Sequence, residues 1–194
     1  MGDYFQTLAD IHAAPEDADR LAADIRDWLI ASGVISPDRT DCVLGAPTGH
    51  PPGPRVNDVV DGTDDSWRDL WSNGLDIKTG QTVFDAGQGE PWAVTCPHCT
   101  TEYTLVSETF ELVLEAWEPF RDVVHGWDEG DKVVKTCPTC ERPVDPQAWQ
   151  WADDYFALGH LGFTFWNWPP LRPDFIAALA ARLGHPPVHL EGKL

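Results

Sequence analysis

Two segments of the chain carry apolar residues at the spacing of an amphipathic helix. The first covers residues 15–32, where Pro15 suits a first turn and Gly33 supplies the stop. Its apolar stripe consists of Ala18, Leu21, Ala22, Ile25, Trp28 and Leu29. The second covers residues 173–183 and is followed by Gly184. We expect a helix at each position, with its stripe packed on a core.

The segment just before the second helix is apolar on both faces. Residues 161–168 read LGFTFWNW, a pattern typical of a buried central strand, and Pro169-Pro170 ends it. Residues 188–190 can form a further strand after the helix. The C-terminal part therefore predicts a strand–helix–strand crossover.

Shorter patterns predict the remaining elements. A helix is expected over residues 107–124, begun by Ser107 and kinked by Pro119. Residues 75–78 and 81–84 predict a hairpin joined through Thr79-Gly80. Short strands are expected at residues 40–44, 92–95 and 132–136. Together these elements predict an α+β fold, a mixed sheet with packed helices.

Charge narrows the range of partners. The 194 residues include 32 acidic and 13 basic side chains, a net charge of −19. This excess argues against nucleic acid and anionic membranes as partners, because both are bound through Lys and Arg. Asp outnumbers Glu by 22 to 10 and Lys is scarce. That bias is typical of a high-GC bacterium or of a halophile, so we expect genome composition or solubility to account for part of the negative charge.

Two Cys-x-x-Cys pairs predict a metal site. Cys96-Pro-His-Cys99 and Cys137-Pro-Thr-Cys140 are separated by 37 residues. Each pair places two thiolates on one tight turn, and two such turns complete the tetrahedron that zinc prefers. The pairing resembles the knuckles of the zinc-ribbon and rubredoxin-like families over residues 92–145, with a long helical insert that a minimal ribbon lacks. The resemblance implies one structural Zn²⁺ held by Cys96, Cys99, Cys137 and Cys140.

The cysteines also allow other interpretations. Cys-Pro-His-Cys resembles the active-site motif of thioredoxin-fold thiol oxidases, in which a helix follows the first cysteine; here a strand pattern follows. Iron or disulfides are further alternatives. The fifth cysteine, Cys42, is interpreted as a small buried apolar residue rather than a nucleophile paired with His50.

Several residues outside the metal site are candidates for recognition. Residues 45–54 form a stiff loop rich in Pro and Gly that carries His50 and leads to Arg55. We expect His50 to face Trp166 or Trp168 of the aromatic strand, with His160 at the strand's entrance. An acidic docking surface is predicted at Asp61, Asp64 and Asp65.

The chain divides by composition into three parts. Residues 1–91 form an acidic α+β part and residues 92–145 the zinc-knuckle module. Residues 146–194 form an aromatic unit that packs with the first part as one compact domain. The start of the chain has no basic or apolar targeting pattern, so a cytoplasmic location is expected.

Three functions remain open. The first is a non-enzymatic, zinc-containing binding or adaptor protein, resembling an immunity protein or anti-factor, that meets a basic protein through acidic and Trp-rich surfaces. The second is an enzyme with a pocket near His50 and His160. The third is a zinc-ribbon protein associated with nucleic acid, supported by Lys132, Lys135 and Arg142. The sequence names no partner, substrate or oligomeric state.

Overall fold

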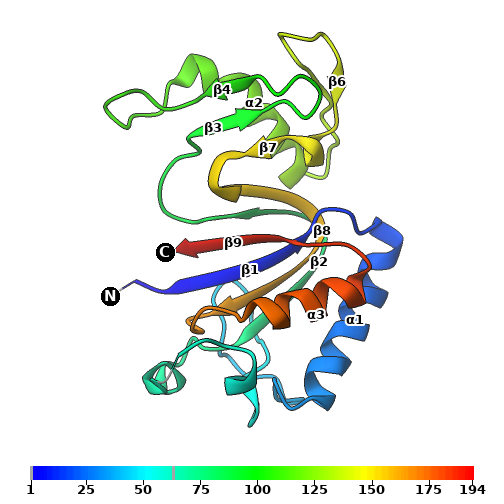
Figure 1. Ribbon diagram of the computed structural model, residues 1–194, viewed down its shortest axis with the longest axis vertical. Helices are drawn as coiled ribbons and strands as arrows, with labels where there is room; N and C mark the ends of the chain where they lie inside the picture. Colours follow the sequence, from blue (N-terminus) through cyan, green and yellow to red (C-terminus); the bar gives the residue numbers. More distant parts are fainter. Residues whose placement is uncertain (1, 63) are drawn as a thin grey trace.

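The computed structural model describes residues 2–62 and 64–194 and has two parts along its long axis (Figure 1). One part is a four-stranded sheet with two helices on one face. The other part, at the top of Figure 1, is an insertion of residues 86–155, here called the cysteine module. The ends of the chain meet at one edge of the sheet, where the Leu194 amide donates to the Asp3 carbonyl over 2.9 Å.

The four-stranded sheet has the order β2-β8-β1-β9. Its elements are β1 (Tyr4–Asp10), α1 (Pro15–Ala31), β2 (Leu75–Asp85), β8 (Phe156–Trp166), α3 (Pro173–Leu183) and β9 (Val188–Lys193). With the cysteine module set aside, the chain order is β-α-β-β-α-β, which is the ferredoxin-like, split β-α-β arrangement. Since this arrangement hosts many unrelated functions, it implies no activity by itself.

The α+β class is confirmed, and the strand pairing is antiparallel. Each ladder between the named strands of the described residues runs antiparallel, where the sequence predicted a mixed sheet. Strands β8 and β9 both run antiparallel to β1, so they are parallel to each other with β1 between them. Helix α3 connects them, which confirms the predicted strand–helix–strand unit.

The main core lies between the sheet and helices α1 and α3, which share one face of the sheet (Figure 1). The predicted stripe of α1 supplies Ile25 and Leu29, which meet Phe163 and Phe165 from β8. Burying such a side chain fully contributes about 1.5–3 kcal/mol. The helical periodicity of residues 15–32 therefore identified the buried side of α1 correctly.

Strand β8 is longer than predicted and is covered on both faces. It begins at Phe156 rather than residue 161 and ends at Trp166. On the face away from α1, the ring of Trp166 packs on Phe5 at 5.1 Å, and residues 42–46 lie over them. At the other end of the strand, Leu158 joins the core of the cysteine module. The apolar pattern on both faces is thus explained by two different covers.

The cysteine module contains its own small sheets and one helix. Strands β4 (Glu102–Thr104), β3 (Ala93–Thr95) and β7 (Gln150–Trp151) form one sheet, and β5 (Lys135–Thr136) pairs with β6 (Pro143–Val144). Helix α2 (Leu114–Asp128) contributes Phe120 to the core of the module, while Trp127 near its C-terminal end donates to the Thr82 carbonyl of β2 over 3.0 Å. Phe120 meets the ring of Trp149 edge-on at 5.0 Å, so tryptophans form the centre of this second core. The pairing of β3 with β7 brings residues 150–151 into the module, although the sequence grouped them with the C-terminal unit.

Four 3₁₀ helices complete the described structure: η1 (Val56–Asp58), η2 (Ser66–Asp69), η3 (Pro146–Ala148) and η4 (Ala152–Asp154). In the part of the chain that is described, no helix has the length and apolar character needed to cross a membrane.

The predicted hairpin at residues 75–84 is wrong. This segment is one strand, β2, and both halves of it pair with β8. The register shifts between Thr79 and Thr82, where Gly80 takes a positive φ of 94°. A glycine with a positive φ is compatible with a β-bulge as well as with a hairpin turn. Strand β8 is as long as β2, so both halves of β2 can pair with it.

Two further predictions differ from the structure, and one strand was not predicted. Residues 40–44 form no strand and make one isolated bridge, between Thr40 and Gly49. The helix predicted at residues 107–124 begins only at Leu114, because Ser107 closes a turn with Glu111. Strand β1 was not predicted, although it lies at the centre of the sheet.

Candidate functional site

The two Cys-x-x-Cys turns have the same backbone geometry. In the first, the Thr100 amide donates to the Cys96 carbonyl over 3.0 Å; in the second, the Glu141 amide donates to the Cys137 carbonyl over 2.9 Å. Thr100 and Glu141 take positive φ values of 57° and 56°. Each turn follows a short strand, β3 or β5, as the sequence predicted.

The four sulfur atoms gather at one point. The Sγ atoms of Cys96, Cys99, Cys137 and Cys140 all lie within 4.8 Å of one another. Cys96 and Cys140 are 3.9 Å apart, and Cys99 and Cys137 are 3.8 Å apart. A tetrahedral shell with metal–sulfur bonds of about 2.3 Å has edges of about 3.8 Å, whereas a disulfide bond measures about 2.05 Å. The cysteines are therefore positioned to hold a metal ion.

Polar groups around the Cys137 sulfur favour its thiolate form, whereas at Cys140 a backbone contact with Arg142 lowers the pKa but burial and the neighbouring cysteine sulfurs outweigh it and raise the pKa to about 11. The Tyr103 hydroxyl lies 3.0 Å from the Cys137 Sγ, and the His98 amide donates to the Cys96 Sγ over 3.4 Å. Burial acts against ionisation of Cys137, but hydrogen bonds from Tyr103 and from backbone amides prevail and lower its pKa to about 6. A thiolate is the form that a metal requires, so these contacts prepare the site.

The site links two parts of the cysteine module that the chain separates. Cys96 and Cys137 are fully buried, while Cys99 and Cys140 are partly exposed. One turn belongs to the β3–β4 pair and the other to the β5–β6 pair, with helix α2 between them in sequence. A bound ion would therefore fix both small sheets beneath the helix.

His50 is buried and lies at the edge strand β2. Its backbone exchanges hydrogen bonds with Leu75, and its Nδ1 lies 2.9 Å from the Ser36 carbonyl oxygen. Burial, together with the positive charges of Arg39 and Arg26, lowers the pKa of His50. Arg55, which the sequence grouped with His50, instead pairs with Asp58 at the surface.

The other aromatic candidates lie in different places. Trp166 and Trp168 are both buried; Trp166 packs on Phe5, whereas Trp168 belongs to the helix-side core. His160 packs on Trp127 of the cysteine module at 5.1 Å. The structure thus places Trp166, Trp168 and His160 in three separate environments.

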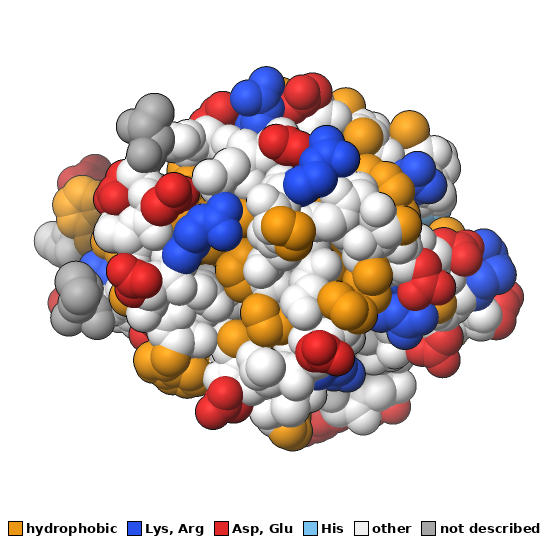
Figure 2. Space-filling model, turned by 90° about the horizontal axis from the view of Figure 1, so that it is seen from below, with side chains coloured by type: hydrophobic (Ala, Val, Ile, Leu, Met, Phe, Trp, Pro, Cys, Tyr) orange, Lys and Arg blue, Asp and Glu red, His pale blue; other side chains and the backbone are white. Residues whose placement is uncertain are grey.

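The predicted acidic surface is interspersed with arginines. Asp65 lies 3.4 Å from Arg68, and Asp61 lies 3.9 Å from Arg172. Asp64 accepts hydrogen bonds from the amide and hydroxyl of Ser66. On the face at the bottom of Figure 1, shown in Figure 2, acidic and basic side chains are likewise mixed rather than gathered by sign.

Cys42 is buried in a small apolar cluster with Val43, Phe5 and Trp166. Its sulfur lies close to Gly74, where a side chain would collide with it. This position agrees with the interpretation of Cys42 as a small apolar residue.

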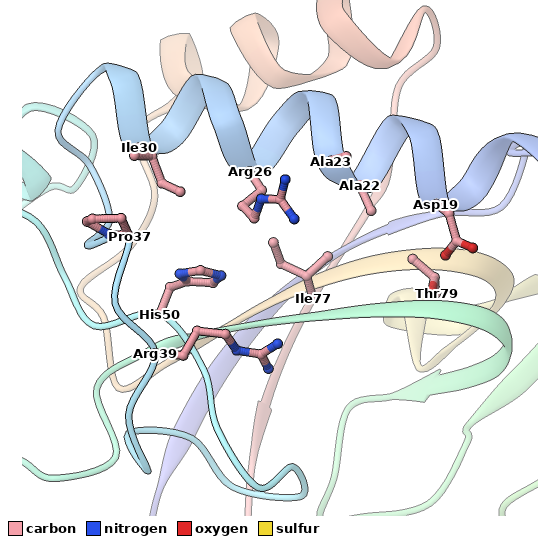
Figure 3. Close-up of a pocket in the computed structure, with 10 residues that line it drawn as sticks. All are labelled: Asp19, Ala22, Ala23, Arg26, Ile30, Pro37, Arg39, His50, Ile77 and Thr79. Carbon is pink, nitrogen blue, oxygen red and sulfur yellow. The ribbon is translucent and has the colours of Figure 1, made fainter.

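The structure contains one feature that the sequence predicted only in part and one that it did not predict. One is a cavity of about 440 Å³ beside α1 that His50 shares with Arg26 and Arg39 (Figure 3). The other is a set of exposed apolar side chains on the cysteine module, Trp92, Phe110, Val113 and Leu114; the Trp92 and Phe110 rings are in contact, and Val113 and Trp92 are each hydrogen-bonded to the backbone of Leu105. The described lining of the cavity includes His50 but not His160, and both features depend on contacts between segments that are distant in the chain.

No protein-family model, curated protein or solved structure matches this chain. The resemblance to zinc-ribbon and rubredoxin-like knuckles therefore depends on the two cysteine turns alone.

Proposed function

We propose that this chain is a non-enzymatic binding or adaptor protein whose cysteine module, held by a structural zinc ion, docks on a basic protein partner. The observation that carries the proposal is a group of exposed apolar side chains on that module, with exposed glutamates close to them in the sequence. We define the aromatic patch as Trp92, Phe110, Val113 and Leu114.

Zinc suits the site because four thiolates fill its tetrahedral shell. A filled shell leaves no position for water or substrate, which is the arrangement of a structural rather than a catalytic ion. Zinc also has no redox chemistry that would complicate such a role. The ion would hold the module in the shape that presents the aromatic patch.

The aromatic patch consists of large side chains that the fold leaves in solvent. Phe110 is 71% exposed, Leu114 65% and Trp92 45%. The rings of Trp92 and Phe110 meet edge-on at 5.3 Å, so they form one surface. Exposed aromatic groups of this kind supply most of the binding energy at protein interfaces.

The backbone beneath Phe110 is strained in a way that favours display of its ring. Phe110 has a positive φ of 64°, a conformation that costs a bulky residue about 1–3 kcal/mol. The turn is closed by hydrogen bonds of 3.0 Å from the Phe110 amide to Ser107 and 2.8 Å from the Ser107 amide to Glu111. This strain does not stabilise the isolated chain. Its presence beneath an exposed ring therefore supports a role for Phe110 in binding.

The charge around the aromatic patch indicates the kind of partner. Residues 79–120 contain seven acidic side chains and no Lys or Arg. Among the described residues, Glu90, Glu108, Glu111 and Glu115 are exposed and form no ion pair with a basic side chain. Exposed glutamates that neighbour apolar side chains in the sequence complement a basic surface with an apolar anchor.

The contacts of the basic residues near the second cysteine turn favour this function over nucleic-acid binding. Lys132 lies 3.3 Å from Asp145, and the Lys135 ammonium lies over the Phe120 ring at 5.1 Å. Arg142 is exposed, and residues 92–142 hold only four basic side chains against ten acidic ones, too few to form a basic stripe.

Paired variants test the proposal. Immobilised protein captures partners from a native lysate, and the captured protein is then purified and its affinity measured. Phe110→Ser and Trp92→Ala should each weaken binding about tenfold or more, as expected for interface anchors. Trp71→Ala is the matched control, because Trp71 is 63% exposed but lies outside the aromatic patch.

Salt and charge variants complete the test. Neutralising Glu108 and Glu111 should slow association and reduce its salt dependence. Neutralising Asp61, Asp64 and Asp65 examines the acidic surface expected from the sequence. Equal binding by wild type, Phe110→Ser and Trp92→Ala, each with full zinc content and an unchanged melting temperature, would refute the proposal.

A further inference from the structure

A second site is indicated by the cavity of about 440 Å³ between α1 and the edge strand β2. Figure 3 shows α1 above the cavity and β2 below it, with the loop that carries Pro37, Arg39 and His50 closing one end. This volume lies in the range of about 300–1,000 Å³ that small-molecule sites occupy.

Positive groups gather at that closed end. The guanidinium of Arg26 projects from α1 and that of Arg39 comes from the loop, with the ring of His50 to one side of them and the Ile77 side chain between them in this view (Figure 3). Asp19 and Thr79 stand at the opposite end. The lining carries two of the nine arginines against one carboxylate, Asp19, in a chain of net charge −19.

In the described part of the chain, neither arginine forms a salt bridge with a buried carboxylate. Arg26 pairs with Asp27 at the surface, an exposed contact of the kind that contributes about 0–1 kcal/mol and exchanges readily. Arg39 donates to the Thr48 carbonyl and lies near the buried carboxyl of Asp76. Each guanidinium has five N–H donors, so both retain donors for a ligand.

His50 supplies a neutral acceptor beside the two cations. Its Nδ1 lies 2.9 Å from the Ser36 carbonyl oxygen, and a carbonyl can only accept, so Nδ1 carries the proton. Burial and the nearby Arg39 and Arg26 lower the pKa of His50, which keeps the ring neutral. Nε2 is then the nitrogen that can accept a hydrogen bond from a ligand.

The rest of the lining is apolar. Ile30 and Ala22 from α1, Pro37 from the loop and Ile77 from β2 enclose the space between the charged ends. A site with an apolar wall and a few convergent polar groups is the usual form of a small-molecule pocket.

We propose that this cavity binds a small organic anion through a carboxylate or phosphate group held between Arg26 and Arg39. A hydroxyl or amino group of the ligand donates to Nε2 of His50, and the ligand's carbon skeleton lies on Ile30 and Ile77. The proposal is independent of the binding function of the cysteine module, which lies at the other end of the molecule (Figure 1).

Titration calorimetry with three probes tests this site at constant ionic strength. Malate and succinate carry the same two carboxylates, but malate alone has a hydroxyl; inorganic phosphate tests the other anion. We expect malate to bind at least fivefold more tightly than succinate, because only malate can donate to His50. Tighter binding of phosphate than of malate would assign the site to phosphate compounds.

Arginine variants show whether binding occurs in the cavity. Arg26→Gln and Arg39→Gln should each weaken the tightest probe at least tenfold. Arg20→Gln is the matched control, because Arg20 lies on the same helix and pairs with Asp17 and Asp24 outside the cavity. It should bind like wild type.

Two results would overturn the proposal. One is that none of the three probes binds the wild type at millimolar concentration. The other is that Arg26→Gln and Arg39→Gln bind as tightly as Arg20→Gln, which would mean that the anions act by general screening of the acidic protein. Because these variants leave the aromatic patch intact, failure here is distinct from failure of the proposed function.

Discussion

Removal of one hydroxyl group tests the metal site without touching a cysteine. In Tyr103→Phe the ring remains packed on Phe120 at 5.6 Å, and only the hydroxyl beside Cys137 is lost. Burial and the neighbouring Cys137 sulfur raise the pKa of Tyr103, so in the wild type this hydroxyl stays protonated and can donate to the thiolate.

The expected effect follows from the contact. A hydrogen bond to a charged group contributes about 1.5–3 kcal/mol, and loss of an outer-shell contact typically reduces metal affinity about 10–100-fold. A 10–100-fold change corresponds to about 1.4–2.7 kcal/mol, so the two ranges agree. We therefore expect Tyr103→Phe to bind zinc 10–100 times more weakly than the wild type.

Competition against a chromogenic chelator at neutral pH measures the affinity. Tyr155→Phe is the control, because the Tyr155 hydroxyl donates to the carbonyls of Gly87 and Gly89, away from the sulfur atoms. Tyr155→Phe should keep wild-type zinc affinity. If Tyr103→Phe binds zinc within twofold of the wild type, or if both variants weaken it equally, the role assigned to Tyr103 is refuted.

Three further predictions concern stability. Cys137→Ser should release one zinc ion per chain, unfold the cysteine module and lower the melting temperature, and removal of the metal with a chelator should have the same effect. A metal-free protein with the melting temperature of the wild type would contradict this. Glu141→Gly should raise the free energy of unfolding by about 1 kcal/mol in denaturant titrations, because glycine relieves the positive φ of 56°, whereas Glu141→Ala should not stabilise. Burial raises the pKa of Asp76, so the wild type loses stability as pH rises from the unfolded pKa of about 3.9 through the higher folded pKa. Asp76→Asn removes that loss, and its stability relative to the wild type should be greater at pH 7 than at pH 4; an equal difference at both pH values would show that Asp76 does not titrate as stated.

Local patterns were enough to predict several elements. The stripe of α1 and the limits of α3 follow from side chains within a few turns of each other, framed by Pro15, Gly33, Pro173 and Gly184. The cysteine turns are equally local, because each needs only four or five residues to form. Two such turns of the same type also identified their shared metal site, since a tetrahedral ion requires both.

The tertiary structure decided what depends on partners distant in sequence. Whether Thr79-Gly80 turns or bulges was settled by β8, which pairs with both halves of β2. Strand β1 has no strong periodicity of its own and gains its place from β8 and β9 on either side. The cavity of Arg26, Arg39 and His50 unites a helix and two loop segments, and no local pattern records such a meeting. Charge and residue spacing along a chain carry information only about residues that are close in sequence. The sequence by itself therefore determined the helices and the metal-binding turns. Long-range pairing determined the sheet and the surfaces available for binding.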